Sequence, residues 1–376
     1  MSAVYFHIPF CKQACHYCNF HFSTSLKYKD ELIAAMHKEV LLRKDELPET
    51  PLDSIYFGGG TPSLLSPAEI GSLIATVKNH FQLNPEVEVT LEMNPDDYRD
   101  GYFEEIKAAG VNRLSVGVQS FMDGELMDMN RAHNAKEAFD MMYEVKKYFT
   151  NFSLDLIYGV PWSSMSTWQK NIALALGFDP PHISSYALTV EPKTVLAKQV
   201  ADDKVKLLHE ETIAEQFDLL VEMLTSKGYD HYELSSFALP GYHSVNNSAY
   251  WQGKPYLGIG PSAHSFYQNL RSWNLSNNKL YIKKINKGKL PIEREQLTLV
   301  DQYNEFVMTG LRTSSGVALN EIKNRFGDKF AVLFEKQVDK HLARYHLYWD
   351  GDTVKVTKQA KFLVDGIASD LFLLNL

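Results

Sequence analysis

The segment Cys11-Lys12-Gln13-Ala14-Cys15-His16-Tyr17-Cys18 holds every cysteine of the 376-residue chain, in a C-x3-C-x2-C pattern. Sulfur ligands favour zinc, copper(I) and iron–sulfur clusters, so three thiolates on one short loop indicate a soft metal centre. A [4Fe-4S] cluster ordinarily takes four cysteines, and three would leave one iron open to a substrate. The spacing therefore predicts a [4Fe-4S] cluster held by Cys11, Cys15 and Cys18.

Two other interpretations of this segment stay open. A structural zinc ion would need a fourth ligand, and His7, His16 and His21 are close enough in sequence to supply it. Unrelated buried thiols are the other alternative, which the clustering disfavours. A disulfide is also disfavoured, because the cysteine count is odd and the N-terminus does not resemble a signal peptide.

The composition is typical of a globular cytoplasmic protein. Hydrophobic residues make up 45% of the chain and aromatic residues 12%, which is ample for a large core. No apolar run approaches the ~20 residues that a membrane span requires. Reduced thiols without an export signal indicate the cytoplasm. The net charge of −8 argues against general nucleic-acid binding.

The first half of the chain alternates apolar runs with amphipathic helical stretches, which is typical of βαβ units and a parallel sheet. We predict an α/β fold in which residues 1–190 form a partial (β/α)6 barrel of the TIM-like type. The predicted strands cover 3–8, 53–58, 87–92, 112–117, 152–158 and 182–187, and the clearest helices cover 28–45, 67–81, 135–148 and 166–176.

Unusual residues fall where these predicted strands end. Cys11 follows the first strand, Gly58-Gly59-Gly60-Thr61-Pro62 the second, and Gln119 the fourth, while Glu92 ends the third. The glycines are expected to let a ligand approach the backbone and its N–H donors. Asp155 lies in an apolar run, where an unpartnered carboxylate is costly, so we expect it to bind something. Barrel enzymes build their sites at this rim.

Residues 191–300 are expected to complete the barrel. A charged helix is predicted over 202–227, a strand over 229–238, and a polar, aromatic loop over 243–251. His243, Tyr250, Trp251 and His264 are candidates to line a pocket for a flat aromatic ligand. The basic stretch 279–294 indicates a solvated helix face and linker.

Residues 301–376 predict three helices followed by a hairpin with Asp350-Gly351-Asp352 at its turn. This pattern is typical of a winged-helix-like domain and raises DNA binding as an alternative. The segment carries ten Lys or Arg and ten Asp or Glu, so it lacks a basic footprint. We expect packing or partner docking there, and no nucleic-acid partner.

Together these motifs resemble the radical SAM (S-adenosylmethionine) proteins related to oxygen-independent coproporphyrinogen III oxidase, and among them the heme chaperones of the HemW type. The resemblance runs almost the whole length of the chain. Besides the cysteine segment it rests on Tyr5-Phe6-His7-Ile8-Pro9-Phe10, Phe57-Gly58-Gly59-Gly60-Thr61-Pro62-Ser63, Gly117-Val118-Gln119-Ser120-Phe121, Asn130-Arg131-Ala132-His133 and Asp155-Leu156-Ile157-Tyr158-Gly159.

The resemblance implies a [4Fe-4S] cluster on the three cysteines, with SAM chelated to its open iron. Arg131 would pair with the SAM carboxylate, a charge-assisted contact suited to guanidinium. Asp155 would bind the ribose hydroxyls. The residues implied around SAM are Tyr5, Tyr17, Gly59, Gly60, Thr61, Glu92, Gln119, Arg131, Asp155 and Ala187.

Two features favour the chaperones, which bind heme and pass it to heme proteins such as respiratory enzymes. The oxidases carry a fourth cysteine at the position of Phe20 in this chain. They also carry an N-terminal extension, whereas this chain begins ten residues before Cys11. One feature opposes them, because the chaperone motif His-Asn-x-x-Tyr-Trp begins here with Asn246. We predict that His243, three residues upstream, replaces the missing imidazole and binds heme beside Tyr250 and Trp251.

The resemblance leaves the activity open. The alternative to a chaperone is an enzyme that cleaves SAM to a 5′-deoxyadenosyl radical and oxidatively decarboxylates porphyrinogen propionates. A zinc-stabilised barrel without redox chemistry is a third reading. No catalytic residue is identified at this stage, and SAM cleavage, the identity of the heme acceptor and homodimer formation stay open.

Overall fold

Six parallel strands in chain order form the centre of a twelve-stranded sheet in the computed structural model, which describes residues 2–374. Each strand pairs in parallel with the next, so each connection must cross over the sheet. These strands are β1 (Ala3–Ile8), β2 (Leu52–Gly59), β3 (Leu83–Met93), β4 (Arg113–Gln119), β5 (Phe152–Tyr158) and β6 (His182–Ala187).

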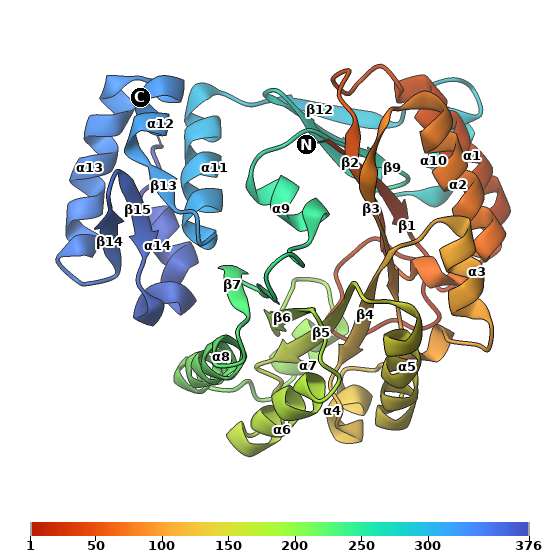
Figure 1. Ribbon diagram of the computed structural model, residues 1–376, viewed down its shortest axis with the longest axis horizontal. Helices are drawn as coiled ribbons and strands as arrows, with labels where there is room; N and C mark the ends of the chain where they lie inside the picture. Colours follow the sequence, from red (N-terminus) through yellow and green to blue (C-terminus); the bar gives the residue numbers. More distant parts are fainter. Residues whose placement is uncertain (1, 375–376) are drawn as a thin grey trace.

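Helices make the crossovers and cover the outer face of the sheet (Figure 1). Two of them begin with a capping box, formed by Ser66 with Glu69 and by Asn134 with Glu137, which satisfies the first free backbone N–H groups. The helices are α1 (Lys29–Arg43), α2 (Pro67–His80), α3 (Tyr102–Ala109), α4 (Asp123–Asp128), α5 (Ala135–Tyr148) and α6 (Met165–Leu176).

Shorter strands extend the sheet at both edges. On one side β9 (Tyr256–Ile259) pairs with β1 and is followed by β10 (His264–Tyr267), β11 (Leu270–Asn274) and β12 (Ile292–Gln296). On the other side β6 is followed by β8 (Ser236–Ala238) and β7 (Asp230–Glu233). Because β12 and β7 are both edges, the sheet does not close. The predicted partial barrel is therefore confirmed.

Three local predictions between residues 195 and 251 differ from the structure. The predicted helix over 202–227 is shorter, α8 (Glu210–Thr225), and an unpredicted helix, α7 (Val195–Ala201), ends just before that range, where Asp203 adopts a left-handed φ of 54°. The single strand over 229–238 folds back as β7 and β8, and the Glu233 carboxylate accepts the Ser235 N–H at 3.0 Å in the turn.

The predicted loop over 243–251 contains a helix, α9 (Val245–Trp251). The Ser244 hydroxyl caps its first turn by accepting the Asn247 N–H at 3.3 Å. The Glu88 carboxylate, on β3, accepts the Val245 N–H at 3.1 Å and the Asn246 N–H at 3.4 Å. An anion at a helix N-terminus is stabilising, and here it comes from a strand distant in sequence.

The C-terminal part of the chain has a separate hydrophobic core, around Tyr303, Val307, Phe334 and Val354. Three helices and a hairpin surround it, as the sequence predicts, and a 3-10 helix and a fourth α-helix that follow the hairpin also pack on it. Its elements are α11 (Leu299–Arg312), β13 (Val317–Ala318), α12 (Leu319–Phe326), α13 (Asp328–Leu342), β14 (Leu347–Asp350), β15 (Thr353–Val356), a 3-10 helix (Lys358–Leu363) and α14 (Val364–Asp370). We call residues 299–374 the C-terminal unit; α10 (Asn278–Ile285) precedes it.

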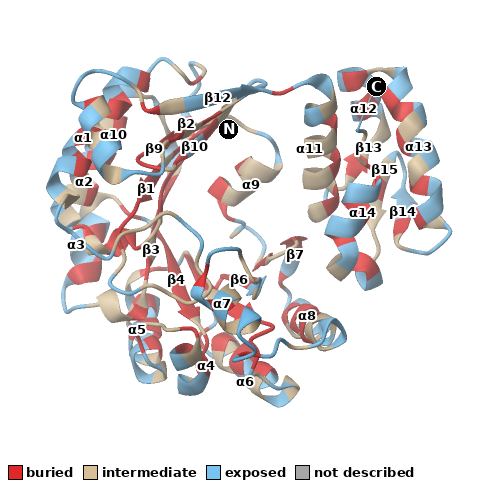
Figure 2. Ribbon diagram, turned by 180° about the vertical axis from the view of Figure 1, so that it is seen from behind, coloured by how far each residue is buried: buried red, intermediate tan, exposed pale blue. Residues whose placement is uncertain are grey.

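The main core lies between the sheet and its outer helices, where Figure 2 shows the buried residues concentrated on the strands. Helix α9 lies on the inner side of the sheet, facing the C-terminal unit (Figure 1). Within residues 2–374, none of the helices combines the length and the apolar character needed to cross a membrane.

Candidate functional site

The cysteine segment forms a loop at the carboxyl end of β1, held by backbone hydrogen bonds at both ends. The Cys11 N–H donates to Ser23 O at 3.1 Å, and the His16 N–H donates to Met129 O at 3.1 Å. The three thiols are free and partly exposed. Burial raises the pKa of the Cys11 thiol to about 11, while a hydrogen bond with Thr61 acts in the opposite direction. The neighbouring thiols of Cys15 and Cys18 raise the Cys11 pKa further, because nearby groups that can become anions disfavour a further negative charge.

Arg131 connects the cysteine loop to the rest of the rim. Its Nη1 atom donates to Cys15 Sγ and to Tyr17 Oη, both at 3.3 Å. Its Nη2 atom donates to Asn94 Oδ1 at 2.6 Å and to Gly117 O at 3.0 Å. The Nε atom is buried and has no partner among the described residues. A guanidinium with one donor unused, beside three thiols, is suited to an incoming carboxylate.

The thiols do not form a site for a single ion with other side chains. No group of three or more His, Cys, Asp or Glu residues within 2–374 is arranged to hold one metal ion. The histidines considered as a fourth zinc ligand use ring nitrogens elsewhere: His7 Nε2 with His21 O at 3.0 Å, His16 Nδ1 with Asp128 O at 2.9 Å, and His21 Nε2 with Asn278 Oδ1 at 2.7 Å. Tetrahedral zinc requires four ligands within ~2.3 Å of one point. The donor set instead fits a multi-iron cluster, whose thiolates bind separate iron atoms.

The glycine triplet brings the second strand end close to the first rather than leaving its donors free. The Gly60 N–H donates to Ile8 O at 2.9 Å, and the Thr61 N–H donates to Phe10 O at 2.6 Å. A Cβ on Gly60 would lie 2.6 Å from Phe10 O, too close for any other residue. Gly59 has a φ of 109°, which only glycine adopts readily. The triplet therefore holds the cysteine loop against β2.

Glu92 and Asp155 are two carboxylates on the inner face of the sheet, near the strand ends. Glu92 accepts from Tyr56 Oη at 2.8 Å and from the Gly59 N–H at 3.3 Å. Burial, with a contribution from Asp155, raises the pKa of Glu92 to about 7, although the Tyr56 bond opposes the shift. Burial also raises the pKa of Asp155, which accepts hydrogen bonds from Ser115 at 3.1 Å and Ser153 at 3.0 Å.

The other residues that the sequence associates with SAM lie at the same rim. Gln119 ends β4 with a left-handed φ of 64°, and its amide nitrogen would be 3.0 Å from a Cβ on Gly117. Tyr5, on β1, stacks on Tyr56 with ring centres 5.9 Å apart. Ala187 is exposed at the end of β6. Nine of the ten predicted residues lie on strands β1 to β6 or on the loops at their carboxyl ends, and Arg131 lies in the turn between α4 and α5.

Sequence reasoning missed Asn94, the residue that joins these parts. Its Oδ1 atom accepts from Arg131, and its Nδ2 atom donates to Thr61 Oγ1 at 3.1 Å. It also missed Lys12, inside the cysteine segment, whose Nζ atom lies 2.9 Å from Asp96 and 2.6 Å from Asp97. The available signal was the segment Asn94-Pro95-Asp96-Asp97, directly after β3.

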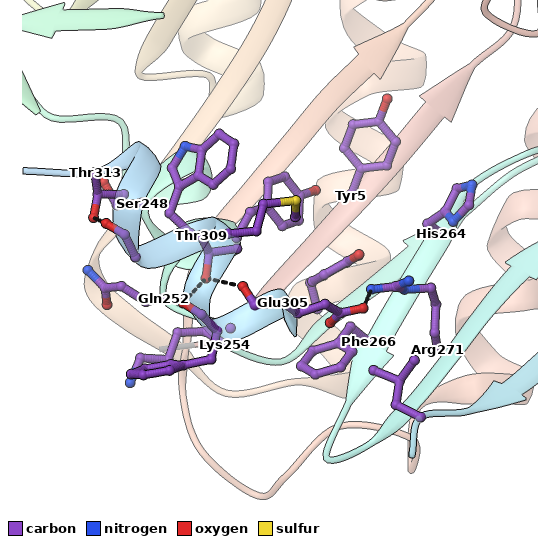
Figure 3. Close-up of a pocket in the computed structure, with 18 of the residues that line it drawn as sticks. Tyr5, Ser248, Gln252, Lys254, His264, Phe266, Arg271, Glu305, Thr309 and Thr313 are labelled. Atoms are coloured by element: carbon purple, nitrogen blue, oxygen red, sulfur yellow. Dashed lines mark hydrogen bonds and ion pairs between the residues drawn. The ribbon is translucent and has the colours of Figure 1, made fainter. Parts of the chain in front are cut away.

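A cavity of about 1610 Å³ opens from this rim toward the C-terminal unit. Figure 3 shows part of its wall, with Tyr5 and His264 at one end and Glu305 and Thr309 of α11 opposite. Arg271 of β11 pairs with Glu305 at 2.5 Å across the lower wall. The wall is rich in aromatic side chains: Tyr5, Phe20, Tyr232, Tyr250, Trp251, Tyr256, Phe266 and Phe306.

The residues predicted to bind a flat ligand all line this cavity. Trp251 lies under the Arg312 guanidinium, whose carbon is 5.1 Å from the ring centre. His243 stacks on Tyr232, with ring centres 4.2 Å apart and planes at 14°, and its Nε2 atom lies 3.4 Å from Asp230 Oδ2. Asn246 does not reach the cavity, because it is buried and accepts from Ser54 Oγ at 3.3 Å.

Comparisons with known proteins identify the family. The profile of the Radical SAM superfamily matches residues 5–175, and that of the HemN C-terminal domain matches residues 297–363. The chain is 31% identical to the heme chaperone HemW of Lactococcus lactis over 97% of its own length and 98% of that protein. It is 33% identical to the heme chaperone HemW of Bacillus subtilis, over 96% of its own length and 97% of that protein. The chain belongs to the HemW family of radical SAM proteins.

A solved structure agrees with this membership in fold. Coproporphyrinogen III oxidase (HemN) from Escherichia coli, described as a radical SAM enzyme, superposes with a TM-score of 0.85 over 99% of this chain and 90% of that one. The two chains are 23% identical, so the likeness shows a common architecture. The predicted HemW-type resemblance and the radical SAM fold are both confirmed.

Proposed function

We propose that the chain is a heme chaperone, which carries a [4Fe-4S] cluster and SAM at the strand ends and receives heme in the adjoining cavity. The observation that carries the proposal is the aromatic-lined cavity of about 1610 Å³ between the rim and the C-terminal unit. It exceeds the ~300–1,000 Å³ of ordinary small-molecule pockets, and a porphyrin is a large flat ligand. The near full-length likeness to proteins named heme chaperones supports the same reading.

Cys11, Cys15 and Cys18 are the proposed cluster ligands, and the ten rim residues are the proposed SAM site. When bound, the cluster and SAM would supply electron-transfer chemistry that protein side chains lack. Arg131 would direct its unused Nε–H toward the SAM carboxylate, and Glu92 would accept from its amino group. Asp155 would accept from the ribose hydroxyls through the lone pairs that its serine partners leave free.

His243 is the proposed heme-iron ligand, in place of the histidine that Asn246 replaces. Histidine ligands commonly direct one ring nitrogen toward a carboxylate or carbonyl, which fixes the ring and leaves the other nitrogen for the metal. Asp230 stands in that relation to His243 Nε2, which leaves Nδ1 for iron. Trp251 and Tyr250 would contact the porphyrin plane. The cargo would then pass to heme-accepting proteins, respiratory enzymes among them.

A second function, oxidative decarboxylation of a porphyrinogen, is favoured by the HemN-like architecture. Both functions would use the same SAM residues, so the product separates them. The enzyme would release 5′-deoxyadenosine and a decarboxylated porphyrinogen under reducing conditions. The chaperone would bind hemin without consuming it.

The test is a hemin titration of anaerobically cluster-reconstituted protein, followed at the Soret band. A saturable, near-stoichiometric shift is the expected result. Absence of a specific shift, together with 5′-deoxyadenosine formation from SAM and a porphyrinogen, would overturn the chaperone in favour of the enzyme.

The ligand is tested by His243→Ala, with His80→Ala on the exposed end of α2 as the matched control. His243→Ala should weaken hemin binding and change the Soret maximum, because the imidazole ligand is lost. Unchanged binding and an unchanged spectrum would remove His243 from the site while leaving the chaperone reading intact.

A further inference from the structure

A buried chain of hydrogen bonds runs across the sheet from Asp155 to the wall of the cavity. Asp155 Oδ1 accepts from Ser153 Oγ at 3.0 Å. Ser153 Oγ lies 2.8 Å from His182 Nδ1, and His182 Nε2 lies 2.7 Å from Tyr232 Oη. The three relay residues between the carboxylate and the cavity have exposed fractions of 0% for Ser153 and His182 and 7% for Tyr232.

The strands bring these residues together. Ser153 and Asp155 are two apart on β5 and therefore face the same side of the sheet. His182 on β6 is the register partner of Ser153, and Tyr232 follows on β7. Residues directly opposite on paired strands have side chains in contact. Strand register thus fixes the Ser153–His182 contact, whereas His182 and Tyr232 meet across β8, at the register shift of β7.

The donors in this chain have one consistent direction. The Ser153 hydroxyl gives its only hydrogen to Asp155, so Ser153 must accept from His182 Nδ1–H. His182 is then the Nδ1–H tautomer, and its Nε2 atom accepts from the Tyr232 hydroxyl. Tyr232 Oη in turn accepts the Ser244 N–H at 3.4 Å. Burial holds the pKa of His182 well below its usual value, so the ring is neutral and acts as donor and acceptor at once.

Tyr232 connects this chain to both parts of the cavity. Its ring carries the stacked His243 ring at 4.2 Å. Its backbone oxygen accepts the Ser314 N–H at 3.0 Å, a contact with the C-terminal unit, and the next residue, Glu233, bridges to Thr313. Ser244, which donates to the Tyr232 hydroxyl, directly follows His243 in sequence and caps α9.

We propose that Ser153, His182 and Tyr232 are positioning residues that couple SAM binding at Asp155 to heme binding at His243. This inference rests on the proposed function and adds to it the regulation of the cargo site. A ribose that donates to Asp155 keeps the carboxylate ionised and all donors directed toward it. The Tyr232 oxygen then accepts from Ser244 and holds the segment that carries His243.

The alternative arrangement differs by one proton, taken from solvent by Asp155 when no ribose is bound. The protonated carboxyl then donates to Ser153, Ser153 to His182 Nδ1, and His182 Nε2–H to Tyr232. The Tyr232 hydrogen turns from His182 toward Ser236, whose buried Oγ atom has no hydrogen-bond partner among the described residues. A ligand that favours one of two such arrangements shifts the population toward it, and the effect on a second ligand is reciprocal.

The experiment measures hemin affinity of the cluster-reconstituted full-length protein with and without saturating SAM, anaerobically and without a reductant. For the wild type, we expect SAM to tighten hemin binding about fivefold or more, and hemin to tighten SAM binding by the same factor. Tyr232→Phe keeps the ring that stacks on His243 and removes only the hydroxyl. Without the hydroxyl that accepts from Ser244, it should bind hemin more weakly than the SAM-bound wild type, and the SAM effect should fall to less than about twofold.

Ser153→Ala breaks the chain at its other end and should have the same effect on coupling. Tyr229→Phe is the matched control, because it removes a buried tyrosine hydroxyl near β7 that bonds Pro180 O outside the chain. It should retain the full SAM effect. A folded Tyr232→Phe protein with full coupling, or a wild type that binds hemin equally with and without SAM, would overturn the inference alone. A wild type that does not bind hemin would overturn the proposed function and the inference with it.

Discussion

The strand-end site and the cavity wall are held in place by different means. At the strand ends, Arg131 donates four hydrogen bonds to groups from three separate segments, and Asn94 continues the network to Thr61. In the cavity wall, Trp251 is covered by a guanidinium from the C-terminal unit, and His243 is held by a ring stack and one carboxylate. The first site is built within one hydrophobic core. The second forms where two cores meet.

This difference teaches where rigidity and adjustment lie in the molecule. A site within one core is fixed by strand register, so a substitution there should disturb the cofactors and the stability of the fold. A cavity between two cores can widen or narrow as they move relative to each other, because inter-domain contacts are generally weaker than core packing. Substitutions in its wall should act on heme and leave the cluster intact.

The largest expected effect is on the cluster. Cys18→Ala should reduce the iron and sulfide content of reconstituted protein to near zero, because two thiolates cannot hold the proposed cluster. If the two sites are as separate as their contacts indicate, the same variant should still give a saturable hemin titration in the absence of SAM. Iron analysis and the Soret titration measure the two results. Full iron content would contradict the proposed ligand set, and loss of hemin binding in a folded variant would contradict the separation.

Arg131→Met should have the next largest effect. The variant loses the hydrogen bonds that the charged guanidinium donates to Asn94 Oδ1 and Gly117 O at a partly buried site. This loss should lower the free energy of unfolding by about 3 kcal/mol. Arg131→Lys keeps the charge but loses the forked geometry of the guanidinium, so its free energy of unfolding should lie between those of the wild type and Arg131→Met. Urea unfolding of the cluster-free proteins separates this loss from loss of the cofactor. Equal stability of all three proteins would show that the network does not hold the rim.

The sequence could group the candidate residues of the strand-end site because their signals are local. Cysteine spacing, the glycine triplet at the end of β2 and the acidic residue inside β5 are each visible in one short segment, and strand order brings them together. The role of Asn94 was not predicted, because an asparagine after a strand is ordinarily a turn residue. Its role appears only when the chain folds and places it between Arg131 and Thr61.

The cavity wall was less predictable because its structure depends on distant contacts. Residues 243–251 are polar and aromatic, and the helix there is stabilised by Glu88, more than 150 positions away in sequence. The Tyr232–His182 contact joins strands separated by α7 and α8. No local pattern encodes either interaction. The aromatic and histidine content of the segment predicted the pocket itself but not the backbone that presents it.

The pH dependence of stability should report on Glu92 at the strand-end site. The pKa of Glu92 is raised from its ordinary 4.5 to about 7, chiefly by burial. The folded protein therefore binds this proton more tightly than the unfolded chain. The stabilisation is fully present below pH 4.5 and is lost as the pH rises through 7, by about 3 kcal/mol.

Glu92→Gln removes this titration, so the wild type minus variant difference in unfolding free energy should slope downward between pH 4.5 and 7. SAM affinity should rise over the same range in the wild type, because the ionised carboxylate accepts from the SAM amino group. It should rise less in the variant. A flat difference curve would place the Glu92 pKa near its ordinary value.

The smallest effect should come from the contact between the two cores. Arg312→Met removes the guanidinium over Trp251 and its ion pair with Asp365, contacts that together contribute about 1 kcal/mol. Lys340→Met is the control, because it removes one exposed ion pair, with Asp370, inside the C-terminal unit. Only Arg312→Met should weaken hemin binding, by about fivefold if the released Trp251 transmits the whole 1 kcal/mol. The iron content of both variants should stay at the wild-type level. Equal hemin affinity of the two variants would mean that the C-terminal unit does not shape the wall, and the cavity would then be as fixed as the rim.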